Sequence, residues 1–163
     1  MQKKTSIMLI SIFILINLFF CIKNEELEEI LYNENAPWYI EINKINLKEN
    51  LYLDSITSED IKGVVLFKEY GRPNVEYSNT IIGAHSGTGE NVYFNDIDKL
   101  KLGDEIFIYY KNIKYKYVVI DKYEVIETDL TPLNSMKNKT ILTLITCNSI
   151  DNTKRVIVVS ERF

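Results

Sequence analysis

Glycine, proline and clusters of basic residues are scarce in this sequence. Its 163 residues include 6 Gly and 3 Pro, too few to favour a glycine-rich nucleotide-binding fold, whereas its 11 Tyr suit a twisted antiparallel sheet. The formal net charge is −4 and no basic block interleaves with aromatic residues, so a nucleic-acid partner is not indicated. With no internal repeat and 46% hydrophobic residues, the chain is expected to hold one domain plus appendages.

The first 37 residues differ in character from the rest. Residues 6–22 carry no charge and follow Lys3 and Lys4, which predicts a transmembrane signal anchor with residues 1–5 in the cytoplasm and the globular part outside. The bulky pair Phe19-Phe20 before Cys21 disfavours both signal cleavage and lipidation, and the absence of a polar face disfavours a buried core helix. Residues 23–37 read as an acidic spacer.

From Trp38 onward the sequence alternates between short apolar runs and turn signals. The two insertions between these runs, 91–100 and 129–136, each have room for a turn or two of helix. We therefore predict a mainly β fold over 38–163: a closed eight-stranded barrel with one or two short helices, preceded by the transmembrane helix. The runs expected to form strands are 38–42, 45–47, 51–53, 62–67, 79–84, 104–110, 113–126, 139–146 and 154–161.

The residues suited to nucleophilic chemistry stand at predicted strand ends. His85, the single histidine, follows the strand 79–84, and Cys147 follows the strand 139–146. Arg155 begins the next strand, and an antiparallel pairing of these last two strands would bring Cys147 and Arg155 to one rim. Each residue alone is commonly structural, but their joint placement favours a site.

A thiol attacks an acyl group only as the thiolate, so it needs a proton partner and gains from nearby positive charge. Arg155 does not give up its proton; it suits the substrate carbonyl and the oxyanion, which leaves His85 as acid and base. A coupled thiol and imidazole predict a bell-shaped pH profile.

Several segments together resemble the sortase family. The string Thr143-Leu144-Ile145-Thr146-Cys147 followed by Arg155 resembles the TLxTC…R signature, and Ile81-Ile82-Gly83-Ala84-His85 is similar to the segment that ends on the family's histidine. The stretch from Phe94 to Asp104 resembles the connector after that histidine, and Trp38 to Tyr52 resembles the opening strands. The likeness covers residues 38–163.

The resemblance implies a membrane-anchored transpeptidase of Gram-positive bacteria. Cys147 would attack the Thr–Gly bond of a Leu-Pro-x-Thr-Gly-like sorting signal on a surface protein, and an amine of a cell-wall precursor or a pilin would resolve the thioacyl enzyme. His85 would move the protons, and Arg155 would hold the carbonyl and the oxyanion. The loop 127–138 would form a wall of the peptide groove, and Ala84 and Thr146 would contact the substrate.

The resemblance also bears on subclass and on metal. A spacer of about fifteen residues and an end at Phe163 directly after a strand lead us to expect a class A/D-like enzyme rather than a pilin-polymerising one. No cofactor or metal is expected. Glu69, Glu76 and Glu124 or Glu127 are the candidate calcium ligands, but scattered carboxylates mostly indicate a solvated surface.

Two other functions remain open at this point. An exported β-barrel cysteine peptidase would use the same thiol and imidazole and let water resolve the acyl enzyme. A membrane-tethered binding module would have no catalytic role for Cys147.

Overall fold

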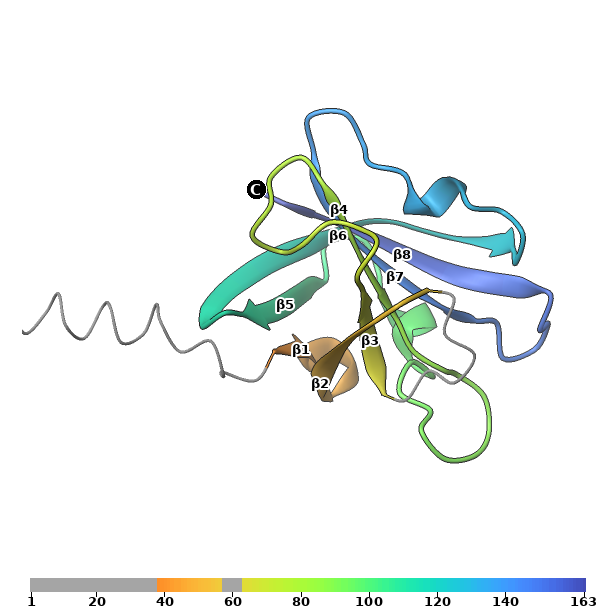
Figure 1. Ribbon diagram of the computed structural model, residues 1–163. Coiled ribbons are helices and arrows are strands. Elements are labelled where there is room, and N and C mark those ends of the chain that lie inside the picture. The colour runs from red at the N-terminus through yellow and green to blue at the C-terminus, as the bar shows by residue number, and fades with distance from the viewer. Residues whose placement is uncertain (1–37, 57–62) are drawn as a thin grey trace, which may run out of the picture. The chain divides into compact units, whose positions relative to one another are not determined.

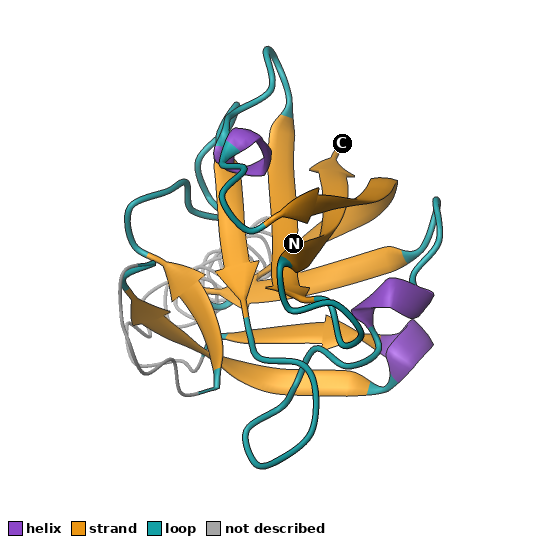
Figure 2. Ribbon diagram, turned by 90° about the vertical axis from the view of Figure 1, so that its right-hand side faces the viewer, coloured by secondary structure: helices purple, strands orange, loops and turns teal. Residues whose placement is uncertain are grey.

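The computed structural model describes residues 38–56 and 63–163, which are almost entirely strands and loops (Figure 1). Three single turns of 3₁₀-helix lie in the connections between strands (Figure 2). The elements in chain order are β1 (Tyr39–Ile42), η1 (Asn43–Ile45), β2 (Leu47–Asp54), β3 (Val64–Phe67), β4 (Asn79–Gly83), η2 (Ile97–Lys99), β5 (Glu105–Tyr110), β6 (Ile113–Ile126), η3 (Thr131–Leu133), β7 (Thr140–Cys147) and β8 (Lys154–Arg162).

The eight strands close into a barrel in the order β1-β2-β3-β4-β7-β8-β6-β5, so the predicted closed, mainly β fold is confirmed. Closure leaves no long unpaired edge in the sheet. Most neighbours are antiparallel, but β2 pairs with β3 and β4 pairs with β7 in parallel. The parallel contact between β4 and β7 matters most for function, because it places the carboxyl ends of both strands at the same rim.

The prediction of helices was partly wrong. Each insertion that was expected to hold a short helix contains one 3₁₀ turn, η2 or η3, and a third turn follows β1; no α-helix is present among residues 38–56 and 63–163. The strand expected at 45–47 was also wrong, because Ile45 belongs to η1 and Asn46 adopts a left-handed conformation with φ 52°. The runs expected at 45–47 and 51–53 are therefore replaced by one strand, β2.

Hydrophobic side chains fill the barrel and also cover part of its outer face. The interior cluster includes Ile82, Leu144 and Val158, one from each of the adjacent strands β4, β7 and β8. Since side chains alternate along a strand, the neighbours Ile81, Ile145 and Ile157 point outward, where they belong to two smaller clusters. Ile81 and Ile157 are 0% and 1% exposed, so other parts of the chain, Leu133 among them, cover this outer face.

The predicted signal anchor at 6–22, the tail before it and the acidic spacer at 23–37 all lie outside the described residues. Among the elements formed by residues 38–56 and 63–163, none is a helix long and apolar enough to cross a membrane.

Candidate active site

The parallel pairing of β4 with β7 aligns the residues that follow the two strands. The register pairs Ile82 with Leu144 and Gly83 with Ile145; continued by two residues, it sets His85 level with Cys147. Two hydrogen bonds hold the strand ends together beyond the ladder. Thr146 Oγ1 donates to the Ala84 carbonyl over 2.7 Å, and Ser86 Oγ donates to the carbonyl of Cys147. The imidazole and the thiol therefore leave neighbouring strands at one level.

The antiparallel pairing of β7 with β8 brings in the guanidinium. Cys147 is the register partner of Arg155, as expected from the sequence, and Ile145 is the partner of Ile157. Because alternate residues share a face, Cys147 and Arg155 lie on the same outer face as the two isoleucines. His85, Cys147 and Arg155 therefore lie at or next to the ends of three adjacent strands, on one rim of the barrel.

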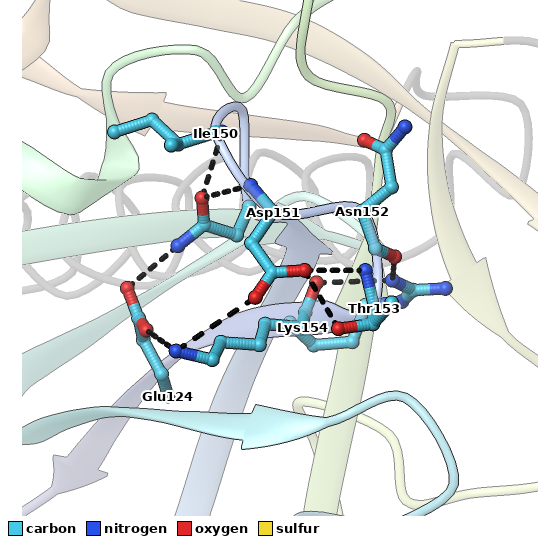
Figure 3. Close-up of polar contacts among 8 residues, drawn as sticks. Glu124, Ile150, Asp151, Asn152, Thr153 and Lys154 are labelled. Carbon is cyan, nitrogen blue, oxygen red and sulfur yellow. Dashed lines mark hydrogen bonds and ion pairs between the residues drawn. The ribbon is translucent and has the colours of Figure 1, made fainter.

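Hydrogen bonds between side chains and backbone of the loop itself shape the short connection between Cys147 and Arg155 (Figure 3). The carboxylate of Asp151 accepts hydrogen bonds from the backbone N–H and the hydroxyl of Thr153, and these bonds lower the pKa of Asp151. At the start of the loop, Asn148 Oδ1 accepts from the N–H groups of Ile150 and Asp151. Such local bonds fix the turn and with it the positions of the strands on either side.

The three candidate catalytic side chains differ in exposure and in their partners. His85 is exposed and Cys147 is a partly exposed free thiol, so both are accessible to a substrate. The Arg155 side chain is 27% exposed. Its Nη1 donates to the carbonyls of Asn152 and Lys154, and its Nη2 donates to Glu127 Oε2 over 2.9 Å. These bonds fix the guanidinium on the outer face, on the strand next to Cys147.

A groove with a volume of about 390 Å³ opens beside these side chains. Its floor is the apolar outer face of β4, β7 and β8, and its wall is the long β6–β7 connection that carries η3, drawn in blue in Figure 1. The wall begins at Asp129, whose pKa is lowered by hydrogen bonds from Thr131. The groove is lined by Ile56, Phe67, Gly83, Ala84, His85, Val125, Glu127, Asp129, Leu130, Pro132, Leu133, Ile145, Thr146, Cys147, Arg155 and Ile157.

Ala84 and Thr146, which the resemblance assigned to substrate binding, border this groove but turn their side chains away from it. Ala84 is 8% exposed and belongs to the interior cluster, and Thr146 is 4% exposed with its hydroxyl bonded to Ala84. Their evident part in the structure is to join β4 to β7 one residue before His85 and Cys147.

The structure adds contacts that sequence reasoning missed. The side-chain amide of Asn95 makes two hydrogen bonds with the backbone of Gly87: it accepts from the N–H over 2.7 Å and donates to the carbonyl over 3.1 Å. These bonds close the loop that follows His85, and the His85 carbonyl itself accepts from the N–H groups of Tyr93 and Phe94. Asn95 and Ser86 carry no sequence signal of this role, because polar residues in a loop are ordinarily just solvated.

Three of the four carboxylates considered for calcium, those of Glu69, Glu124 and Glu127, have other partners. Glu69 accepts bonds from the Ser55 hydroxyl and the Ile56 N–H, and the Ser55 bond is the main reason why the pKa of Glu69 is lowered. Glu124 lies beside Lys154 and Asn148, and Glu127 beside Arg155. No group of three or more metal-binding side chains occurs in the part of the chain that the structure describes.

Residues 40–163 match the model of the sortase domain family. Among curated proteins, sortase A of Bacillus anthracis is 35% identical over 91 residues, a match that spans 51% of this chain and 40% of that protein. The chain thus matches less than half the length of that relative.

Solved structures extend the similarity to the fold. Sortase C1 of Streptococcus agalactiae superposes with a TM-score of 0.71 at 31% identity, covering 81% of this chain and 70% of the other. A structure of Clostridium perfringens sortase C with the C-terminal cell wall sorting motif gives a TM-score of 0.70 at 33% identity, covering 77% and 69%. The family model spans the whole barrel from β1 to β8 and the rim where Cys147, His85 and Arg155 meet, and the chain therefore belongs to the sortase family.

Proposed function

We propose that this protein is a membrane-anchored sortase, a cysteine transpeptidase that cleaves a Leu-Pro-x-Thr-Gly-like sorting signal and transfers the released acyl group to an amine. The observation that carries the proposal is the convergence of three strand ends. The β4–β7 register sets His85 level with Cys147, and the β7–β8 register pairs Cys147 with Arg155 beside an apolar groove.

In the first half-reaction the Cys147 thiolate attacks the carbonyl carbon of the Thr–Gly bond. The negative charge that develops on the carbonyl oxygen is stabilised by the Arg155 guanidinium, which keeps its proton throughout. When the C–N bond breaks, the imidazolium of His85 gives its proton to the departing glycine nitrogen. The products are a thioacyl enzyme, a free amine and neutral His85.

In the second half-reaction an incoming amine attacks the thioester carbonyl. His85 accepts a proton from that amine, a new amide bond forms, and the Cys147 thiolate leaves, which restores the starting charge state. Water in place of the amine would give the free acid. The transpeptidase outcome therefore depends on the amine reaching the thioester before water does.

The groove supports a peptide as the acyl donor. Its floor is apolar, and so is its wall at Leu130, Pro132 and Leu133, which suits an extended peptide with a hydrophobic side chain some residues before the cleaved bond. One of the solved relatives, Clostridium perfringens sortase C, is described with its C-terminal cell wall sorting motif. Ala84 and Thr146 would meet the peptide near the cleaved bond through backbone atoms, since their side chains are buried.

The proposal extends to location and partners. Residues 6–22 would anchor the protein with its N-terminus in the cytoplasm and the barrel outside the membrane. The acyl donors would be surface proteins with C-terminal sorting signals, and the acceptor an amine of a peptidoglycan precursor or a pilin. The relatives are divided in subclass, since the curated one is named sortase A and the two solved ones are named sortase C. A class A/D-like attachment enzyme, rather than a pilin polymerase, therefore remains a proposal from the sequence.

A product analysis tests the proposal. The protein is incubated with a labelled Leu-Pro-x-Thr-Gly peptide with and without an added amine such as triglycine, and the products are identified by mass spectrometry. We expect a new amide that appears only with the amine and is lost in Cys147→Ala. Formation of acid alone, at any amine concentration, would identify a cysteine peptidase. No cleavage by wild-type protein across a panel of sorting peptides would favour a binding module.

A further inference from the structure

Asn79 is a buried amide on the face of the barrel that carries the candidate active site. It is the first residue of β4 and is 3% exposed. Because side chains alternate along a strand, Asn79 faces the same side as Ile81, Gly83 and the exit of His85. It lies six positions before His85, a rise of roughly 20 Å along a strand, so it does not touch the reacting atoms.

The amide of Asn79 makes three hydrogen bonds that join three segments. Its Oδ1 accepts from the hydroxyl of Thr143 in β7 over 2.9 Å. Its Nδ2 donates to the carbonyls of Pro132 and Asn134, each over 3.0 Å. The orientation follows from chemistry, since carbonyl oxygens only accept and must face the two N–H donors. Both donors of the amide are therefore used.

The two carbonyls belong to the wall of the groove. Pro132 lies within η3 and Asn134 follows it directly, while Leu130 and Leu133 line the groove. Within this segment the N–H groups of Leu133 and Asn134 bond only to carbonyls one turn back. Among the hydrogen bonds of residues 38–56 and 63–163, those of Asn79 are the ones that connect residues 130–135 to a strand.

Apolar contacts hold only part of the wall, so its position also depends on these bonds. Pro132 is buried and Leu133 packs against the outer cluster that contains Ile81, but Leu130 is 65% exposed. If Asn79 lost its donors, two backbone carbonyls would be left without partners in a partly buried place, and the wall would move outward to reach water.

We propose that Asn79 is a positioning residue that fixes the groove wall, and so sets the width of the apolar part of the groove that receives the acyl-donor peptide. The structural part of this inference stands on the hydrogen bonds of Asn79, and its consequence for the peptide rests on the proposed function. A loosened wall weakens ground-state binding of the peptide more than it slows the chemistry, because Cys147, His85 and Arg155 keep their registers.

Hydrogen exchange on the protein without substrate tests the structural part. The variant Asn79→Asp keeps the acceptor for Thr143 but turns a carboxylate oxygen toward two carbonyls, and Asn79→Ala removes the donors without adding charge. We expect exchange at the amides of Leu133 and Asn134 to accelerate by about tenfold or more in both variants. Amides of β7 should keep their protection relative to the global stability of each variant.

Two threonine variants make the comparison specific. Thr143→Val removes the hydroxyl that bonds Asn79 but leaves both amide donors, so wall exchange should rise less than in Asn79→Asp. Thr80→Val is the matched control, because Thr80 is equally buried in β4 and, next to Asn79, faces the opposite side near Tyr117. Thr143→Val preserves packing, so it takes the place of the Asn79 variants in the exchange experiment if those do not fold. Unchanged wall exchange in every folded variant, including Thr143→Val, would overturn the inference.

Steady-state kinetics with the sorting peptide and triglycine test the consequence. We expect KM for the peptide to rise by about tenfold in Asn79→Ala while kcat stays within about twofold, and Thr80→Val to leave both unchanged. Faster wall exchange with an unchanged KM would overturn the role in peptide binding. If wild-type protein does not act on sorting peptides, the proposed function fails, whereas the exchange result still decides whether Asn79 fixes the wall.

Discussion

The guanidinium of Arg155 and the carboxylate of Glu127 form an ion pair with 2.9 Å between Nη2 and Oε2. The pair joins the start of β8 to the residue that follows β6, and the backbone adds a bond from the Glu127 N–H to the Thr153 carbonyl. The Glu127 side chain is 52% exposed, so such a pair contributes about 0–1 kcal/mol to stability. Its main effect is to limit the orientations of the guanidinium beside Cys147.

Glu127 variants should therefore affect activity more than stability. We expect Glu127→Ala to lower kcat/KM for transpeptidation by about tenfold while the free energy of unfolding falls by less than about 1 kcal/mol. Glu127→Gln keeps an acceptor oxygen, so its kcat/KM should lie between those of wild-type protein and Glu127→Ala. The measurements are steady-state kinetics and urea unfolding.

Glu105 supplies the control for this prediction. It pairs with Lys116 between β5 and β6, is 47% exposed and does not line the groove. Glu105→Ala should leave kcat/KM unchanged. Equal activity of Glu127→Ala and Glu105→Ala would show that Arg155 needs no help from the carboxylate.

The assignment of Cys147 as nucleophile predicts a selective thiol reaction. In a Cys21→Ala background, iodoacetamide should modify Cys147, and a sorting peptide should slow the modification by occupying the groove. Cys147→Ala and His85→Ala should each lower transpeptidation by at least about a thousandfold, because each removes a group that exchanges a bond or a proton. Full activity of His85→Ala would mean that another group transfers the proton, and it would refute the assignment of His85.

The pH profile of the same reaction is a separate check. If thiol and imidazole act as a coupled pair, kcat/KM should rise and then fall with pH and lose one limb in His85→Ala. A profile that stays flat across the neutral range in wild-type protein would contradict the pair.

The sequence predicted the barrel well because its strands carry local signals. Lys111 and Asn112, for example, separate two apolar runs, and in the structure both have positive φ, as a two-residue hairpin turn requires. The division of β2 into two runs failed for a local reason as well. Lys48 and Asn50 are exposed and Glu49 between them is half-buried, so this run of three polar residues resembles a loop although all three pair with β1.

The rim was predictable in part. The hairpin of β7 and β8 is close in sequence, and so the neighbourhood of Cys147 and Arg155 followed from spacing. The parallel pairing of β4 with β7 joins residues about sixty positions apart, and no local pattern specifies such a partner. The hydrogen bonds from Asn79 to the groove wall were missed for the same reason, since the carbonyls that it binds lie in a connection more than fifty residues away.

Tyr117 predicts how stability responds to alkaline pH. It lies fully buried in β6, and burial raises the pKa of its phenol from 10.0 to about 12. An unfolded chain ionises this phenol near pH 10, whereas the folded protein holds the proton to about pH 12. The stability that the group contributes is therefore present below pH 10 and is lost as pH rises toward 12, by roughly 2–3 kcal/mol in total.

Urea unfolding between pH 9 and 11 measures this effect. Wild-type protein should lose stability steeply over the range, and Tyr117→Phe, which has no phenol to ionise, should show a shallower decline. Tyr52→Phe is the control, because Tyr52 is 55% exposed and its removal should leave the slope unchanged. If the free energy of unfolding falls equally with pH in wild type and Tyr117→Phe, a group other than Tyr117 causes the loss of stability.

Gly83 lies where β4, the groove and the ring of Phe67 meet. A Cβ at this position would stand 2.8 Å from both Cε2 and Cζ of Phe67, closer than side chains tolerate. The ring is the part that can move, since backbone holds Gly83 between Val65 and Ile145. We expect Gly83→Ala to lower the free energy of unfolding by about 1–3 kcal/mol and to raise the peptide KM as the ring shifts into the groove. The double variant Gly83→Ala with Phe67→Leu should recover part of both losses, because the shorter side chain leaves room for the methyl group. Wild-type stability and KM in the single variant would show that the groove floor accommodates the methyl without displacing Phe67.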